Sequence, residues 1–213
     1  MFTGLIETLC TVKSIRPSAG GLALTIDLAT LAKQCEIGDS IAVNGACLTV
    51  AGLSGKLATF ELSGETLRKS ALGRLRPASR VNIERAMKAT DRFGGHIVQG
   101  HIDGTATIGT IKRLGRFADI KFMTGARLLG QMIIKGCVAV DGISLTVAEM
   151  DESSFSAAVV PQTLQNTTLG TARVGDVVNI ETDIIVKAVK KELKRILPQE
   201  PALTAEKLQE LGF

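Results

Sequence analysis

Residues 43–50 read V-N-G-A-C-L-T-V, and residues 140–147 read V-D-G-I-S-L-T-V. Gly142 follows Gly45 by 97 residues (142 − 45). The same offset aligns E-T-L at 65–67 with Q-T-L at 162–164, L-G at 72–73 with L-G at 169–170, and V-N-I-E at 81–84 with V-N-I-E at 178–181. A period of this length is that of a whole small domain, not of a solenoid unit. The sequence therefore predicts two copies of one domain, with two similar sites.

Most of each copy has the pattern of short strands. Large apolar residues alternate with small or polar ones over residues 22–28, 40–44, 118–122 and 137–141, and glycines separate these runs. Each copy also has one short helical candidate, capped by Ser63 over residues 64–69 and begun by Pro161 over residues 161–164. Many short strands with few helices predict an all-β chain of small closed barrels or sandwiches.

A helical pattern follows Asp183 and is predicted to end at Pro198. Its apolar side chains follow an a/d spacing between lysines: Val186, Val189, Leu193 and Ile196. A helix of about three turns is unstable alone, so this stripe needs a partner, either its own barrel or copies of itself. Residues 204–211 have the pattern of a further small amphipathic helix.

Composition narrows the function classes. The net charge of +4 permits an anionic partner, but the chain has no Trp, no Tyr and only seven Phe. Aromatic stacking platforms for single-stranded nucleic acid are therefore scarce, and no nucleic-acid partner is predicted. No apolar run approaches the roughly 18 residues of a membrane span. The first residues lack the pattern of a signal peptide, so we expect a cytoplasmic protein with no membrane partner.

Cysteine and histidine usage points away from metal chemistry. The four cysteines form no C-x-x-C pair, and in a cytoplasmic chain they are expected to be reduced thiols. His96 and His101 are the only histidines, and local spacing cannot assemble a zinc set from them. The sequence predicts no metal.

Several motifs together resemble the riboflavin synthases of the lumazine-binding family. They are M-F-T-G-L-I-E at 1–7, N-G-A-C-L-T-V at 44–50, G-G-H at 94–96, G-H-I-D-G at 100–104, D-G-I-S-L-T-V at 141–147, P-Q-T-L at 161–164 and T-T-L-G at 167–170. The resemblance extends from residue 1 to about residue 189. Each motif is weak alone, and the set is specific.

The resemblance implies a fold and an assembly. The family has two tandem six-stranded antiparallel Greek-key β-barrels and a C-terminal α-helix that forms the core of a homotrimer. We therefore expect an N-terminal lumazine-binding barrel at residues 1–93, a C-terminal one at 94–185 and a helical trimerisation segment at 186–213. In the family, the two barrels of one active site come from different chains.

The implied activity is a transferase reaction without a cofactor. Two molecules of 6,7-dimethyl-8-ribityllumazine dismutate into riboflavin and 5-amino-6-ribitylamino-pyrimidinedione by transfer of a four-carbon unit. Two homologous barrels holding two identical substrates would supply proximity and orientation. The alternative is a non-catalytic lumazine or flavin carrier of the same family. An oligonucleotide-binding twin barrel is a third class, which the missing aromatic residues disfavour.

The resemblance also assigns site residues. Catalytic candidates are Ser144, Thr146, His101 and Cys47. Substrate-binding candidates are those four together with Phe2, Thr3, Gly4, Leu5, Ile6, Leu48, Thr49, Glu61, Leu62, Ser63, Gly64, Glu65, Thr66, Gly100, Ile102, Lys135, Leu145, Val159, Val160, Pro161, Gln162, Thr163 and Leu164.

Simpler interpretations remain open for some of these residues. Cys47 is by default a small buried apolar residue, and His101 between Gly100 and Gly104 can simply belong to a turn. The copies also differ where distinct roles require it. Cys47 aligns with Ser144, and Leu5 aligns with His101 at an offset of 96 (101 − 5). Two unequal pockets are thus expected, as donor and acceptor roles need.

Overall fold

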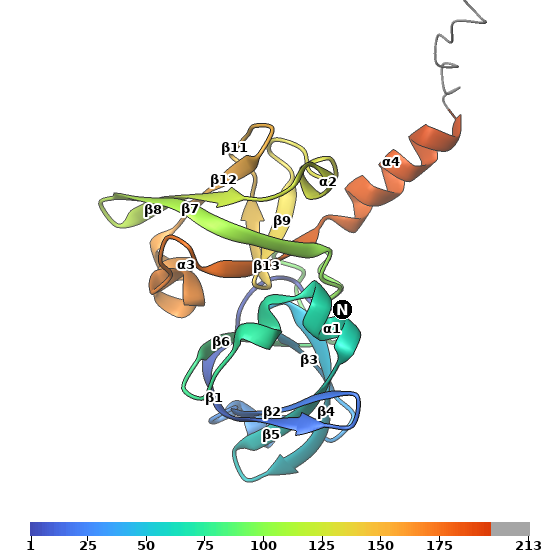
Figure 1. The fold of residues 1–213 in the computed structure, drawn as a ribbon, viewed down its shortest axis with the longest axis vertical. Helices are drawn as coiled ribbons and strands as arrows, with labels where there is room; N and C mark the ends of the chain where they lie inside the picture. The colour runs from blue at the N-terminus through green and yellow to red at the C-terminus, as the bar shows by residue number, and fades with distance from the viewer. Residues whose placement is uncertain (197–213) are drawn as a thin grey trace, which may run out of the picture.

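The computed structural model describes residues 1–196 of the chain. Figure 1 shows two barrels stacked along the long axis, with the C-terminal helix projecting away from the second barrel. The predicted all-β fold of two related barrels and a C-terminal helix is confirmed.

The first copy forms a closed barrel with strand order β1-β2-β5-β4-β3-β6, all neighbours being antiparallel. Alternate side chains along each strand fill its interior, among them the fully buried Ile26, Ile41, Phe60 and Ile83. The strands are β1 (Thr8–Ser18), β2 (Gly21–Asp27), β3 (Ser40–Val43), β4 (Ala46–Ser54), β5 (Leu57–Ser63) and β6 (Arg80–Arg85).

The second copy repeats this strand arrangement as a curled seven-stranded sheet, in which one strand is in two pieces. Its sheet order is β10-β9-β13-β7-β8-β12-β11, and the two terminal strands β10 and β11 together occupy the place of β4. The break falls at residues 147–148, where β4 also shifts register between Val50 and Gly52. The strands are β7 (Gly104–Leu114), β8 (Phe117–Met123), β9 (Cys137–Val140), β10 (Ile143–Thr146), β11 (Glu149–Met150), β12 (Ser154–Val159) and β13 (Val177–Thr182).

Short helices close the ends of the barrels. The predicted helix after Ser63 is confirmed as α1 (Gly64–Lys69), with Thr66 N donating to Ser63 Oγ at 3.1 Å. The predicted helix at Pro161 is confirmed as α3 (Pro161–Asn166). The others are η1 (Leu31–Gln34), η2 (Ala71–Arg74), α2 (Ala126–Leu129) and η3 (Thr168–Gly170). Figure 1 shows α1 and α3 on opposite sides of the junction between the barrels.

Helix α4 (Ile184–Ile196) is tied to the second barrel on one flank. Lys187 Nζ lies 2.8 Å from Asp103 Oδ2, and Lys190 Nζ donates to the Gly130 carbonyl at 2.6 Å. In the predicted stripe, Val186 is half-buried, whereas Val189, Leu193 and Ile196 are exposed. The exposed stripe consists of Ile185, Val189, Leu193 and Ile196.

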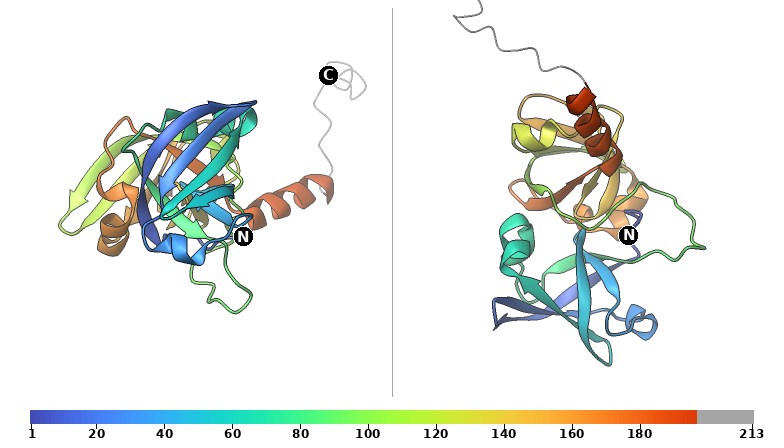
Figure 2. Two further views of the ribbon diagram at one scale, coloured as in Figure 1. Left: turned by 90° about the horizontal axis from the view of Figure 1, so that it is seen from below. Right: turned by 90° about the vertical axis from the view of Figure 1, so that its right-hand side faces the viewer.

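The left view of Figure 2 shows α4 projecting outward past the two barrels. Within residues 1–196, no helix is long and apolar enough to cross a membrane. The helix end predicted at Pro198 and the amphipathic helix predicted at 204–211 lie outside the described residues.

Candidate functional site

The two barrels meet through their repeated glycines. Gly45 and Gly142 both have φ of +78°. A Cβ added to Gly45 would lie 2.6 Å from the Gly142 nitrogen, and one added to Gly142 would lie 2.8 Å from the Gly45 nitrogen. Only glycine tolerates this backbone conformation at such close approach. The reciprocal contact marks a local pseudo-twofold axis between the copies.

The asparagines of the repeated V-N-I-E motif join the barrels across that axis. Asn82 Nδ2 donates to the Asp141 carbonyl at 2.9 Å, and Asn179 Nδ2 donates to the Asn44 carbonyl at 2.7 Å. Their Oδ1 atoms accept from main-chain nitrogens, Asn82 from Thr168 and Asn179 from Ala71. Sequence reasoning assigned these asparagines no role. The signal in the sequence was the same polar residue at equivalent positions of two otherwise apolar strands.

The segment that precedes each barrel crosses to the other one. Phe2 and Val98 pair with each other, Phe2 N donating at 2.8 Å and Val98 N at 3.2 Å. Beyond this pair, the Gly4 carbonyl accepts from Ser144 N in the second barrel at 2.8 Å. The Gly100 carbonyl accepts from Cys47 N in the first barrel at 2.9 Å. Each barrel therefore receives part of its end from the other copy.

A cavity of about 290 Å³ lies where the crossing segment 100–102 meets the first barrel. We call it the first pocket. The N-terminus of α1 and the start of β4 form the rest of its wall, which combines hydroxyl, thiol and charged groups with main-chain atoms. Its lining residues are Ala46, Cys47, Ser63, Glu65, Thr66, Lys69, Ser70, Gly100, His101 and Ile102.

The 97-residue repeat makes the region around Ser144 in the second barrel equivalent to the first pocket, and we use the name second pocket for this region. The crossing segment there is Gly4-Leu5-Ile6, and the start of α3 replaces that of α1. His96 Nδ1 lies 2.7 Å from Ser144 Oγ, and the imidazole is buried. Burial lowers the pKa of His96, which favours the neutral ring. A neutral imidazole bonded to a hydroxyl can move a proton to or from it.

His96 was missing from the predicted site. The G-G-H motif at 94–96 matched the family, but its sequence position said nothing of Ser144, 48 residues away. Its main-chain nitrogen donates to the Thr3 carbonyl at 3.1 Å, which seats the histidine against the crossing segment. The pairing therefore depends on a contact that only the folded chain creates.

Most of the other predicted residues fall into three groups, while Gly64, Pro161 and Thr163 are half-buried in the first turns of α1 and α3. Cys47, Ser63, Glu65, Thr66, Gly100, His101 and Ile102 come together around the first pocket. Thr49, Glu61, Lys135, Thr146, Val160 and Gln162 are exposed. Phe2, Leu48, Leu62, Leu145, Val159 and Leu164 are buried in apolar clusters, so their side chains support the barrels.

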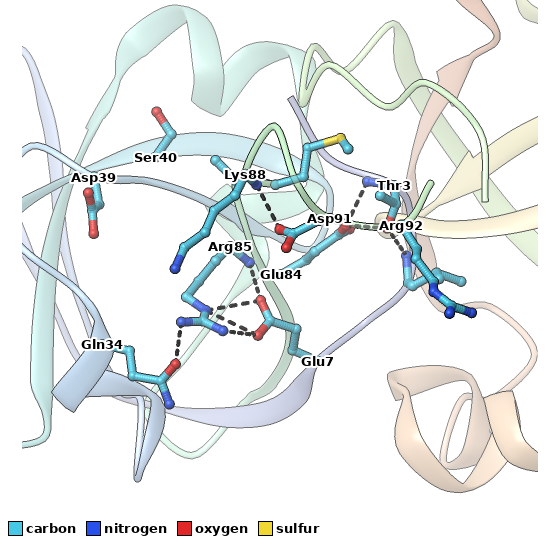
Figure 3. Close-up of a pocket in the computed structure, with 13 residues that line it drawn as sticks. Thr3, Glu7, Gln34, Asp39, Ser40, Glu84, Arg85, Lys88, Asp91 and Arg92 are labelled. Atoms are coloured by element: carbon cyan, nitrogen blue, oxygen red, sulfur yellow. Dashed lines mark hydrogen bonds and ion pairs between the residues drawn. The ribbon is translucent and has the colours of Figure 1, made fainter. Parts of the chain in front are cut away.

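Another cavity lies beside the first barrel, between the end of β6 and the linking residues 86–92 (Figure 3). Its volume is about 440 Å³ and its wall is mainly polar. Glu7 and Arg85 form an ion pair there at 2.7 Å, and Arg85 Nη1 donates to Gln34 Oε1 at 2.7 Å. Residues 86–92, which follow β6, border this cavity. At the equivalent place after β13, the second barrel has the start of α4. Thr3 and Leu5 are the predicted site residues among its lining.

Two related barrels that complete each other's ends across a pseudo-twofold axis define a class of protein built from two copies of one β-barrel domain. The lumazine binding domain family matches this chain twice, at residues 3–86 and 99–183. The chain belongs to that family.

Curated relatives span the whole chain. A riboflavin synthase of Actinobacillus pleuropneumoniae is 40% identical over 215 residues and covers 100% of both chains. That of Bacillus subtilis is 37% identical with the same coverage. That of Schizosaccharomyces pombe is 38% identical and covers 90% of this chain and 93% of its own.

Solved structures share the fold at lower identity. LumP complexed with riboflavin superposes with a TM-score of 0.80 at 22% identity, covering 85% of this chain and 99% of LumP. LumP complexed with 6,7-dimethyl-8-(1'-D-ribityl) lumazine gives 0.78 at the same identity and coverage.

Proposed function

We propose that this protein is a riboflavin synthase, a transferase that converts two molecules of 6,7-dimethyl-8-ribityllumazine into riboflavin and 5-amino-6-ribitylamino-pyrimidinedione. The observation that carries the proposal is the presence of two copies of the lumazine binding domain, unequal at Cys47 and Ser144, in a chain whose full length matches riboflavin synthases. A dismutation needs two bound copies of one substrate in different roles.

The reaction needs no external oxidant or reductant. One lumazine gives up a four-carbon unit and becomes the pyrimidinedione, while the other gains it and becomes riboflavin. The substrate's own ring system stabilises the carbanion formed at its C7 methyl group. The protein must bind both rings, orient them and move protons, and proximity alone can supply much of the rate enhancement.

Side chains of the two pockets match these tasks. In the second pocket, Ser144 and the buried His96 form the candidate proton-transfer pair at 2.7 Å. In the first pocket, Cys47 is the candidate nucleophile at C7, and His101 is a second proton carrier. Thr146 and Thr49 are exposed on equivalent strands and are candidate hydrogen-bond donors to bound ligand.

We infer further that the working unit is a cytoplasmic homotrimer. Helix α1 borders the first pocket and helix α3 the second, and the two helices lie on opposite sides of the barrel junction (Figure 1). This placement favours an active site in which the first pocket of one chain faces the second pocket of another. Helix α4 carries an exposed apolar stripe at Ile185, Val189, Leu193 and Ile196. Such a stripe is suited to a helical interface with copies of itself.

The direct test is incubation with 6,7-dimethyl-8-ribityllumazine alone. Riboflavin and the pyrimidinedione should form in a one-to-one ratio, with one riboflavin for every two lumazines consumed. Tight binding of lumazine or riboflavin without turnover would instead identify a carrier. A requirement for added metal or nucleotide would contradict the proposed reaction.

A further inference from the structure

We propose that Glu84 and Glu181 are positioning residues that act on opposite pockets: Glu84 of the first barrel sets the second pocket, and Glu181 of the second barrel sets the first. The proposal rests on the proposed function, because it assigns the two carboxylates to the two halves of the same reaction. Both residues end the repeated V-N-I-E motif, for which the proposed reaction has no other use.

Each carboxylate holds the main chain of one crossing segment. Glu84 Oε1 accepts from Thr3 N at 2.6 Å and from Thr3 Oγ1 at 2.7 Å, while Oε2 accepts from Gly4 N at 3.0 Å. Glu181 accepts from three successive main-chain nitrogens, those of Gln99, Gly100 and His101, at 2.7, 2.9 and 3.0 Å. Each carboxylate thus accepts three hydrogen bonds from its crossing segment through two oxygens, and we call this arrangement a grip.

The grips are buried. Glu84 is 4% exposed and Glu181 is 2% exposed. A buried carboxylate is costly unless its oxygens are hydrogen-bonded, and these segments satisfy it with several N–H groups at once. If the segment moved away, the carboxylate would lose its hydrogen-bond donors or become exposed to water. The carboxylate therefore confines each segment to one position.

That position is the one that touches the reacting groups. The gripped Gly4 accepts from Ser144 N, and a Cβ on Gly4 would lie 2.6 Å from Ser144 Cβ. The gripped Gly100 likewise accepts from Cys47 N and packs against the Cys47 side chain. The crossing segment and the strand that carries Ser144 or Cys47 are in close contact. Displacement of the segment must therefore displace Ser144 or Cys47. A misplacement of ~1 Å at reacting groups can cost ~100-fold in rate.

The two buried carboxylates have different surroundings. Glu84 lines the large polar cavity of Figure 3, where its bond to Thr3 is visible. Glu181 lies just before α4; burial raises its pKa, and the charge of Lys187 on α4 opposes that rise.

The test compares Glu84→Gln with Glu181→Gln. Glutamine keeps the shape but replaces one accepting oxygen by an NH₂ group facing main-chain N–H donors. We expect kcat to fall ten-fold or more in both variants. Matched controls are Ile83→Val and Ile180→Val, the neighbouring core residues, which should lower Tm while leaving kcat within about two-fold of the unsubstituted protein.

The reactivity of the Cys47 thiol distinguishes a positioning role from a merely structural one, which would leave that reactivity unchanged. Alkylation of this thiol by iodoacetamide, followed by peptide mass mapping, reports on the first pocket alone. Glu181→Gln should change the Cys47 alkylation rate several-fold and abolish its protection by 6,7-dimethyl-8-ribityllumazine. Glu84→Gln should leave both the rate and the protection unchanged despite its loss of turnover.

Two results would overturn the proposal: equal effects of both variants on Cys47, or turnover within two-fold of the unsubstituted protein in both. The alkylation rate without ligand needs neither lumazine binding nor catalysis. It therefore tests the crossed grips even if the protein proves not to be a riboflavin synthase, and the unsubstituted protein's turnover tests the function separately.

Discussion

Asp141 stands where the first copy has Asn44, and the single change from amide to acid gives the junction a titratable group. Both residues have positive φ, and both accept at Oδ1 from an equivalent main-chain nitrogen, that of Asn179 for Asp141 and that of Asn82 for Asn44. Asp141 is buried, and burial raises its pKa from 3.8 to about 7.

The raised pKa predicts a pH-dependent stability. Below pH 3.8 the group is protonated in both folded and unfolded chains and has no effect. Between pH 3.8 and about 7 the unfolded chain ionises while the folded one resists, so stability falls as pH rises. Asp141→Asn should therefore stabilise the protein at pH 8, by on the order of 2–4 kcal/mol, and scarcely at pH 4. Urea unfolding at the two pH values checks this, and an equal gain at both would contradict it.

Ser144 and Thr49 offer a comparison of hydroxyls in opposite copies. Ser144 Oγ is bonded to the buried His96, whereas Thr49 is exposed on β4. Ser144→Ala should lower turnover more than Thr49→Ala, and each lost hydrogen bond should cost about 0.5–1.5 kcal/mol in ligand affinity. Steady-state kinetics and ligand titration measure both quantities. Equal losses of turnover would count against different roles for the two barrels.

At the scale of elements, the junction turns between β3 and β4 and between β9 and β10 depend on glycine for space as well as for conformation. Gly45→Ala would place a methyl group against the Gly142 main chain. Gly38→Ala is the matched control, because Gly38 has φ of +98° but nothing within 4 Å of an added Cβ.

We expect Gly38→Ala to cost about 1–2 kcal/mol for the left-handed backbone alone. Gly45→Ala should cost about 1–3 kcal/mol more, because the barrels must also move apart. Thermal unfolding of the two variants measures the difference. Equal costs would show that the barrels separate freely at this point.

Helix α4 is the element on which assembly should depend. A chain stopped after Thr182 loses the exposed stripe but keeps every strand of both barrels. It should fold, sediment as a monomer and still bind lumazine in the first pocket. Its turnover should be almost absent at low concentration and rise more steeply than linearly with protein. A monomer with full, concentration-independent specific activity would show that one chain contains a complete site.

For the whole molecule, the sequence was most informative where the two copies agree. The repeat and the strand patterns predicted two copies of a small barrel or sandwich, the family resemblance specified barrels, and the spacing after Asp183 predicted the helix. Local patterns cannot say which barrel an irregular segment joins. The crossing of residues 1–6 and 98–102 was therefore not predicted, and neither was the contact of His96 with Ser144.

The roles of Asn82, Asn179, Glu84 and Glu181 escaped prediction for a related reason. Their repetition was visible, but side chains inside a strand pattern suggest a barrel interior until the neighbouring copy is placed beside them. Burial of a carboxylate or amide becomes favourable only through donors and acceptors that arrive from elsewhere in the chain. The sequence thus identified the copies more readily than the bonds between them.

The mutual contact of Gly45 and Gly142 has the form of an isologous interface, the kind that two identical short chains make as a homodimer. In such a dimer the two pockets would be encoded by the same gene, so every substitution would appear in both pockets. Duplication and fusion of the gene remove that constraint. Cys47 can then differ from Ser144, and Leu5 from His101, so one pocket can specialise in giving carbon and the other in taking it.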